Sequence, residues 1–251
     1  YNINNRFDKY YFVPKNKKEL KNAVDYWCKY KDRAMKKYGN ISNWDTTYIK
    51  NMKGLFKNKK GFNDNINEWN TSNVNDMSGM FSNAYSFNQP INDWNINNVK
   101  SMGNMFNSAT YFNQLINNWN TSNVKNMRYM FKHAENYNKP LDNWDTSNVN
   151  DMVGMFAYTD NFNQPLNNWN ISKVWDIEEM FLYTNKFNKP LNNWNTSNIQ
   201  NMRGVFMYSF EFNQPLNNWD ISNVNNMEYM FAFTENFNQR MDNWDNSNII
   251  T

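Results

Sequence analysis

The chain has 251 residues and a formal net charge of +3, and 57 of its residues are asparagine. One cysteine and one histidine exclude a disulfide scaffold and any metal site that needs several thiolate or imidazole ligands. Apolar residues make up 40% of the chain and aromatic residues 18%, which excludes a disordered polypeptide, and no apolar run is long enough to span a membrane.

The first section of the chain, residues 1–43, precedes a repeated region. Asn16 is a helix-capping residue with Glu19 three positions later, the pattern that follows is amphipathic, and Gly39 is a typical C-terminal stop. We expect an N-terminal cap with a helix over about 17–38. Such a helix would cover the open edge of the first repeat, because a terminal repeat otherwise exposes its core.

Tryptophan then recurs every 25 residues, and this period predicts a solenoid or array. Counting each tryptophan as column 1, eight full repeats occupy 44–243 and a partial ninth occupies 244–251. The tryptophans of the series are Trp44, Trp69, Trp94, Trp119, Trp144, Trp169, Trp194, Trp219 and Trp244. One repeat cannot bury enough apolar surface to offset the ordering of its own backbone, so the repeats must stack.

Two apolar spacings occur within each repeat. Positions i, i+3, i+6, i+7 and i+10 predict a short helix, and in the fifth repeat they hold Val149, Met152, Met155, Phe156 and Thr159. Residues 141–149, ahead of that helix, have the spacing of a leucine-rich repeat, with a short parallel strand around Trp144. The predicted fold is an α/β repeat solenoid that is leucine-rich-repeat-like, with one short parallel strand and one short helix per 25-residue turn.

Column 20 is asparagine in every full repeat and follows an aromatic residue. These residues are Asn63, Asn88, Asn113, Asn138, Asn163, Asn188, Asn213 and Asn238. Asparagine hydrogen-bonds nearby backbone and tolerates left-handed conformations. We expect a buried ladder of asparagines that satisfies backbone amides where the chain crosses from helix to strand.

The complete unit, as in Trp69 to Asp93, reads W-(N/D)-T-S-N-V-x-x-M-x-x-M-F-x-x-A-x-x-F-N-Q-P-L-N-N. It resembles the 25-residue repeat of the BspA-like leucine-rich-repeat surface proteins, which are abundant among Mycoplasma lipoproteins, and the resemblance covers about 200 residues. The segment from Phe12 to Leu20 also resembles the capping segment of mycoplasmal members. The excess of asparagine and lysine fits an AT-rich genome.

This resemblance implies a leucine-rich-repeat-like fold, display on the cell surface and roles in adhesion or host interaction. In the family, the surface anchor is often a lipidated cysteine at the mature N-terminus. The chain lacks that cysteine at its start, so a cell-surface, lipid-anchored or exported localisation rests on the resemblance alone.

No catalytic, cofactor or metal site is expected. His133 lies in column 15 as a surface residue with no nucleophile at motif spacing, and Cys28 is expected to be a small buried apolar residue rather than a reactive thiol. Carboxylates that share columns with asparagine are interpreted as solvated positions, with a weak calcium site as the alternative; they are Asp142, Asp145, Asp220, Asp242 and Asp245.

Charge is distributed unevenly along the chain. Residues 1–60 hold 16 Lys and Arg against 5 Asp and Glu, a net of +11, whereas residues 61–251 hold 10 against 18, a net of −8. We interpret the basic section as solvated, with a membrane-proximal role as the alternative, ahead of nucleic acid. Because the acidic repeats would repel a polyanion, no nucleic-acid partner is expected, and a membrane partner only through an anchor absent from this chain.

Column 15 becomes aromatic in repeats five to eight and supplies the candidate partner-binding site. The candidate residues are Tyr158, Tyr183, Tyr208 and Phe233 in this column, with Trp175, Leu182, Met207 and Phe210 close in sequence. If the rings point outward, they form a stripe suited to a protein or glycan contact. The alternative is inward packing, because column 16 changes from alanine to threonine or serine in the same repeats.

The tryptophan column allows a second interpretation. The leucine-rich-repeat alignment places these side chains in the core, but nine outward indoles would make a sugar-stacking platform. The function predicted from the sequence is a non-catalytic bacterial cell-surface interaction or adhesion module, most simply for a protein of the host or of a neighbouring cell. A carbohydrate-binding module and a structural surface-coat protein are the alternatives.

Overall fold

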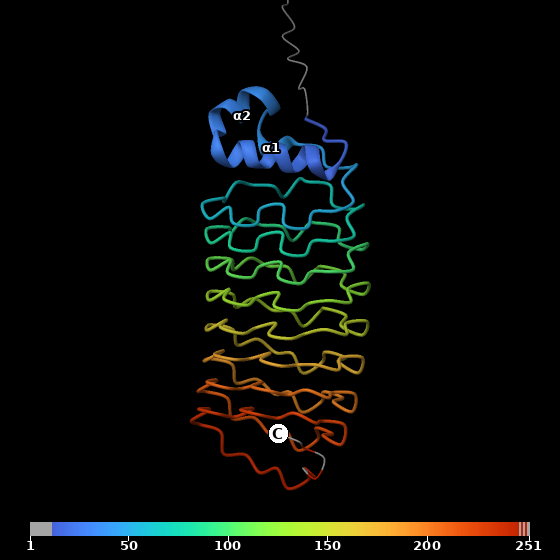
Figure 1. The fold of residues 1–251 in the computed structure, drawn as a ribbon, viewed down its shortest axis with the longest axis vertical. Helices are drawn as coiled ribbons and strands as arrows, with labels where there is room; N and C mark the ends of the chain where they lie inside the picture. Colours follow the sequence, from blue (N-terminus) through green and yellow to red (C-terminus); the bar gives the residue numbers. More distant parts are fainter. Residues whose placement is uncertain (1–11, 246, 248, 250–251) are drawn as a thin grey trace, which may run out of the picture.

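The computed structural model describes residues 12–245, 247 and 249. From residue 44 onward the chain winds into a coil in which each repeat forms one layer on the next, with the helices at one end (Figure 1). Of the predicted sections, residues 1–11 of the cap and residues 246, 248, 250 and 251 of the partial ninth repeat lie outside the described residues.

Between residue 12 and the start of the coil, the structure has three short helical elements. They are α1 (Lys17–Lys29), α2 (Lys31–Tyr38) and the 3₁₀ helix η1 (Ile41–Asn43). The single helix expected over 17–38 is therefore interrupted at Tyr30, whose φ of −139° and ψ of 60° are not helical. No helix of the described chain is long and apolar enough to cross a bilayer.

Helix α1 lies across the first repeat. Asn16 accepts a hydrogen bond from the backbone N–H of Glu19 at 3.0 Å, which is the predicted cap. The buried face carries Trp27, whose ring meets that of Trp44 edge to face at 5.8 Å and whose Nε1 donates to Asp64 at 2.8 Å. The apolar face of α1 thus covers the open edge of repeat one.

The short helix expected in each repeat does not form in the described part of residues 44–245. The segment folds instead as consecutive β-turns, in which Met155 N donates to Met152 O and Ala157 N to Gly154 O, both at 3.1 Å. Gly154 and Tyr158 have φ of 55° and 58°, in columns 11 and 15, and an α-helix does not accommodate these angles. The helix predicted from the spacing of Met and Phe is therefore wrong. Successive β-turns also place these side chains on one face, so the spacing does not distinguish turns from a helix.

The strand expected around Trp144 is also not formed. Repeats pair instead through isolated parallel bridges in column 8, at Asn51–Asp76, Asp76–Ser101, Ser101–Asn126, Asn126–Asp151, Asp176–Asn201 and Asn201–Asn226. Between these layers alternate backbone N–H groups donate to the next repeat, as from Tyr129 to the carbonyl of Val153 at 2.8 Å. A helix would have used the same N–H groups internally, and the coil uses them to join layers.

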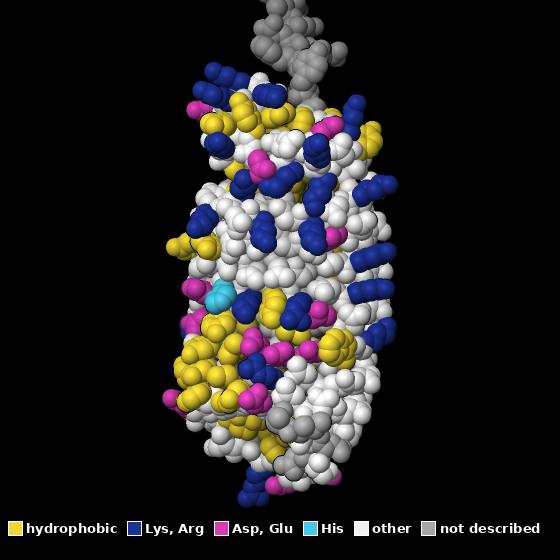
Figure 2. Space-filling view, in the orientation of Figure 1, with side chains coloured by type: hydrophobic (Ala, Val, Ile, Leu, Met, Phe, Trp, Pro, Cys, Tyr) yellow, Lys and Arg dark blue, Asp and Glu magenta, His cyan; other side chains and the backbone are white. Residues whose placement is uncertain are grey.

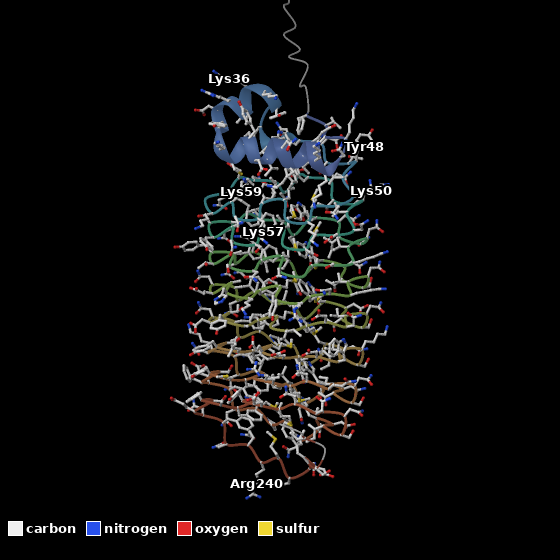
Figure 3. All side chains as sticks on the ribbon, viewed as in Figure 1. Lys36, Tyr48, Lys50, Lys57, Lys59 and Arg240 are labelled. Atoms are coloured by element: carbon white, nitrogen blue, oxygen red, sulfur yellow. The ribbon has the colours of Figure 1, made fainter. Side chains whose placement is uncertain are left out.

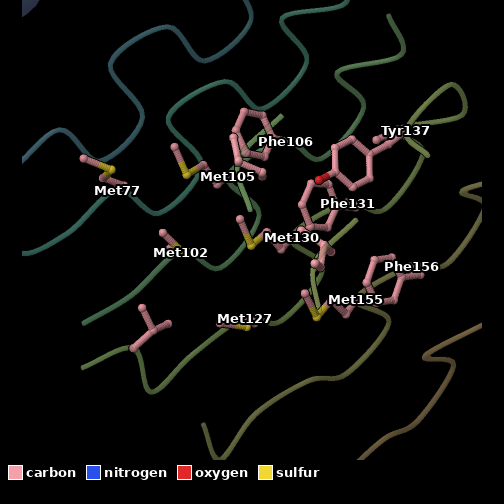
Figure 4. Packing of buried hydrophobic residues seen from close by; sticks show 14 of the residues in the cluster. Met77, Met102, Met105, Phe106, Met127, Met130, Phe131, Tyr137, Met155 and Phe156 are labelled. Carbon is pink, nitrogen blue, oxygen red and sulfur yellow. The ribbon is translucent and has the colours of Figure 1, made fainter. Parts of the chain in front are cut away.

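The core contains parallel stacks of aromatic rings and a row of methionines (Figure 4). Column 13 is a continuous stack of phenylalanines with ring centroids 5.4–5.8 Å apart. The tryptophans of the eight full repeats are only 2–4% exposed, which confirms their place in the core and rules out the sugar-stacking platform. Each indole also bonds to backbone, as when Trp169 Nε1 donates to Leu141 O at 3.0 Å.

The asparagine ladder of column 20 is present, with its bonds running between repeats. Asn138 Oδ1 accepts from the backbone N–H of Asn163 at 3.0 Å, and Asn163 Oδ1 accepts from that of Asn188 at 3.1 Å. The side chains are half-buried or exposed rather than buried as expected. The first seven asparagines of the column therefore each satisfy a loop amide of the adjacent layer.

Replacing Trp169 by Phe should lower the free energy of unfolding by about 2 kcal/mol, because the carbonyl of Leu141 loses its indole donor and a gap opens in the core. Trp175 lies in the same repeat but is 51% exposed, so Trp175→Phe is the matched control and should change stability by less than about 0.5 kcal/mol. Urea denaturation measures both. Equal losses in the two variants would contradict the buried tryptophan column.

Tyr137→Phe should stabilise the protein by about 1–2 kcal/mol. Tyr137 is fully buried in a column that is otherwise phenylalanine, its hydroxyl has no hydrogen-bond partner, and burial raises its pKa well above the ordinary value. The reverse change in the next repeat, Phe162→Tyr, should destabilise by a similar amount. Calorimetric melting of both variants checks the prediction, and a lower melting temperature for Tyr137→Phe would refute it.

Candidate interaction surface

One edge of the coil carries a ladder of stacked rings from column 15 of repeats four to eight. This aromatic ladder comprises His133, Tyr158, Tyr183, Tyr208 and Phe233. Successive ring centroids are 4.3, 5.0, 4.2 and 4.5 Å apart. Figure 2 shows the apolar cluster of this edge below the single histidine, with acidic side chains at its border.

The rings of the ladder stay at the surface. The three tyrosines are half-buried and Phe233 is 61% exposed. The alternative, in which the column 15 rings pack into the core, is therefore wrong. The hydroxyls of that column are buried and bond to the core backbone, as when Thr159 Oγ1 donates to Phe131 O at 2.7 Å. The change from alanine to threonine therefore leaves the neighbouring ring free to face outward.

An aromatic groove with a volume of about 230 Å³ runs beside the ladder. It is lined by Tyr158, Glu179, Leu182, Tyr183, Arg203, Gly204, Met207, Tyr208 and Tyr229. Five of the eight candidate residues from the sequence lie in this lining. Desolvation and the neighbouring Tyr208 raise the pKa of Tyr183, so its hydroxyl is protonated at neutral pH.

The remaining three candidates do not line the groove. Phe233 continues the ladder at its end, and Phe210 meets Tyr208 edge to face at 6.3 Å. Trp175 lies in column 7 and is 51% exposed. The assignment of Trp175 to the candidate site, which was inferred from closeness in sequence, stays a prediction.

A charged network forms one wall of the groove. Arg203 pairs with Glu178 at 3.0 Å, with Glu228 at 3.4 Å and with Glu179 at 3.5 Å, and its guanidinium lies 5.8 Å from the ring centroid of Tyr229. These hydrogen bonds raise the pKa of Arg203. With three carboxylates around one guanidinium, this side of the groove is acidic.

Column 11 supplies residues that the sequence reasoning missed. Tyr129 extends over the next repeat and occupies the space above Gly154, where a Cβ atom would lie 2.3 Å from the tyrosine ring. Arg128 and Lys132 flank the ring of Tyr129, 4.6 and 4.7 Å from its centroid. The sequence carried a signal for this contact, because column 11 mixes four glycines with asparagine, glutamate and tyrosine. In the structure every residue of this column has a positive φ.

The single histidine stacks on an aromatic ring, and the single cysteine is exposed. Desolvation, with Lys132 adding to it, lowers the pKa of His133, so its imidazole is neutral at pH 7 and stacks on Tyr158. Cys28 is exposed, so the expectation of a buried residue was wrong. Partial desolvation of the thiol still raises its pKa to about 11, which keeps it protonated at neutral pH.

Three of the five carboxylates noted in the sequence accept hydrogen bonds from nearby backbone N–H groups. Asp145 Oδ1 accepts from the N–H of Ser147 at 2.9 Å, Asp220 and Asp245 do the same two residues on, and these bonds lower their pKa values. Asp142 accepts from Asn117 Nδ2 at 3.0 Å. Within the described residues, no group of three or more His, Cys, Asp or Glu side chains is arranged to hold a metal ion.

Gly154→Ala should destabilise the protein by about 2–4 kcal/mol, because alanine is strained at φ 55° and its Cβ meets the ring of Tyr129. In a Tyr129→Ala background the same change should cost only about 1 kcal/mol. Gly54→Ala is the matched control, with φ 64° and no atom closer than 3.9 Å, and should also cost about 1 kcal/mol. Urea titration of the four variants measures the coupling, and additive losses would contradict the contact.

The comparisons with known proteins agree with the repeated architecture of the chain. The model of a family described as "Mycoplasma protein of unknown function, DUF285" matches residues 25–121, 93–194 and 165–251. No curated protein and no solved structure gave a match. Since the three matches together extend over residues 25–251, the chain belongs to this Mycoplasma family of unknown function.

Proposed function

We propose that the chain is a non-catalytic interaction module that binds a protein partner through the aromatic ladder and the adjacent groove. The observation that carries this proposal is a row of rings stacked in register along repeats four to eight at a solvent-facing edge. Tyrosine and phenylalanine at rigid surface positions provide large contact area with little loss of side-chain entropy on binding.

Rigidity supports this assignment. The backbone beneath the ladder is bonded to the adjacent layer at each step, since Tyr158 N donates to Leu182 O at 2.7 Å and Tyr183 N to Met207 O at 2.9 Å. Each ring is also held by the ring above or below it. A surface ordered before binding gives up less conformational freedom when it meets a partner.

Display at the bacterial cell surface, through a lipid anchor or export, belongs to the same proposal. It rests on the likeness of the repeat unit to the BspA-like leucine-rich-repeat surface proteins, as does a role in adhesion. The layered coil, with a buried tryptophan in each layer and variable residues outside, is compatible with such a module.

The test compares Tyr183→Ser/Tyr208→Ser with Tyr85→Ser/Tyr111→Ser, a control pair of exposed tyrosines outside the ladder. Proteins captured from host-cell surface extracts by the wild-type chain are purified, and their affinities for all three chains are measured by biolayer interferometry. We expect the ladder pair to weaken binding at least about tenfold, and the control pair by less than about twofold.

Circular dichroism and thermal melting confirm that both double variants remain folded. Equal binding by the ladder variant and the wild type would contradict the proposal, and so would equal loss in the control. Capture of no protein whose retention depends on Tyr183 and Tyr208 would contradict it as well.

A further inference from the structure

The same face of the coil is hollow in its first four repeats, before the ladder becomes aromatic. A polar groove with a volume of about 470 Å³ lies there, which is within the ordinary size range of ligand sites. Its lining includes Lys53, Lys57, Ser78, Ser82, Ser101 and Arg128, with glycine and asparagine between them. Figure 2 shows white, uncharged polar surface between dark blue side chains on this face, and Figure 3 labels Lys57 on the same side, near the α1 end.

Glycines in column 11 leave this space open. Gly54 and Gly79 occupy column 11 in repeats one and two, and an added Cβ on either would meet nothing closer than 3.8 Å. Two repeats further along, Tyr129 fills the equivalent space over Gly154. The backbone is the same in these repeats, so the hollow exists because column 11 is glycine there. An aromatic side chain in column 11 is sufficient to fill it.

The two ends of the polar groove are cationic. Lys53 and Lys57 are exposed, and neither has an acidic partner within ion-pair distance among the described residues. At the other end Arg128 contacts Asp151 only at 3.9 Å, and 41% of its side chain is exposed. Asp76, the nearby carboxylate, already accepts from Asn51 Nδ2 and the N–H of Ser78.

Hydroxyl groups line the floor between the cations. Ser78 and Ser101 are hydrogen-bonded to each other at 2.7 Å. Ser82 also borders the groove and is 7% exposed. Its hydroxyl can donate to and accept from a ligand atom in the groove.

We propose that the polar groove binds an acidic carbohydrate, with sulfate or carboxylate groups at the lysines and Arg128 and sugar hydroxyls on the serines. Serine hydroxyls and asparagine amides donate and accept in the manner that sugar hydroxyls require. Lysine and arginine supply charge-assisted bonds to oxyanions. The lining holds no aromatic ring on which a nucleobase could stack, which favours a sugar over a nucleic acid.

The experiment measures binding of labelled octasaccharides by fluorescence polarisation at low and at physiological salt. The probes are a sulfated heparin-derived octasaccharide, a hyaluronate octasaccharide with carboxylates alone, a neutral maltooctaose and a 12-base-pair DNA duplex. We expect one or both acidic sugars to bind, with the better one identifying the oxyanion, and the neutral sugar to bind at least about tenfold more weakly.

Two variants remove the site in different ways. Lys53→Glu/Lys57→Glu reverses charge at one end, and Gly54→Tyr fills the hollow as Tyr129 does over Gly154. Each should weaken binding of the acidic sugar at least about tenfold. Lys100→Glu/Lys125→Glu has the same change in net charge at exposed column 7 positions and should weaken binding by less than about threefold.

Several outcomes would overturn the proposal. They are binding of the neutral sugar as tight as the acidic one, tighter binding of DNA than of either acidic sugar, no binding of either acidic sugar at low salt, and equal losses in the groove and control variants. Tyr183→Ser/Tyr208→Ser should bind the acidic sugar like the wild type, so this test is independent of the protein-binding role of the ladder.

Discussion

The structure depends on a backbone register that repeats every 25 residues. Because the length is constant, every second N–H from column 9 to column 15 faces a carbonyl of the next layer, as Phe131 N faces Met155 O at 2.9 Å. An insertion of one residue would misplace all of these donors and every side chain in the layer. Stacked turns can hold such a register without long strands, since each layer provides several separate hydrogen bonds.

Side chains supply hydrogen-bond partners for the backbone groups that the turns leave unpaired. Tryptophan in column 1, threonine in column 3 and asparagine in columns 5 and 20 each bond to backbone in a neighbouring layer, as when Asn148 Nδ2 donates to Ser122 O at 2.8 Å. A coil without helices or sheets has many backbone groups of this kind. Much of the asparagine that resembles a compositional bias therefore has a structural role.

The sequence predicted the parts of the fold that depend on burial and period. Trp169 is in the core, and Asn163 forms a ladder, because their columns are constant and their chemistry allows few alternatives. The helix over residues 149–159 was wrong, since β-turns and a short helix place Met152 and Met155 on the same side of the chain. Only the left-handed conformation of the residues in columns 11 and 15 distinguishes the β-turns from a helix. Tyrosine is unusual in that conformation, so Tyr158 does not reveal it in the sequence.

The candidate surface could also be predicted only in part from the sequence. Column 15 could be recognised as variable and aromatic, but its outward direction depends on the φ of Tyr158 and on the hydroxyl of Thr159, which bonds inward. The contact of Tyr129 with Gly154 joins two adjacent layers, and the sequence gives no direct measure of it. One face thus holds two surfaces on one backbone. The surface over repeats one to four is hollow and basic, and the surface over repeats five to eight is aromatic and acidic.

The register itself can be tested by removing one layer. Deletion of residues 94–118 takes out 25 residues and joins repeat two to repeat four in phase, whereas deletion of residues 94–117 leaves the chain one residue out of phase. Urea unfolding followed by tryptophan fluorescence compares the two variants with the full chain. The account predicts a cooperative transition and shielded tryptophan for the 25-residue deletion, and a loss of at least several kcal/mol, or of folding altogether, for the 24-residue deletion. Equal stability of the two deletions would contradict it.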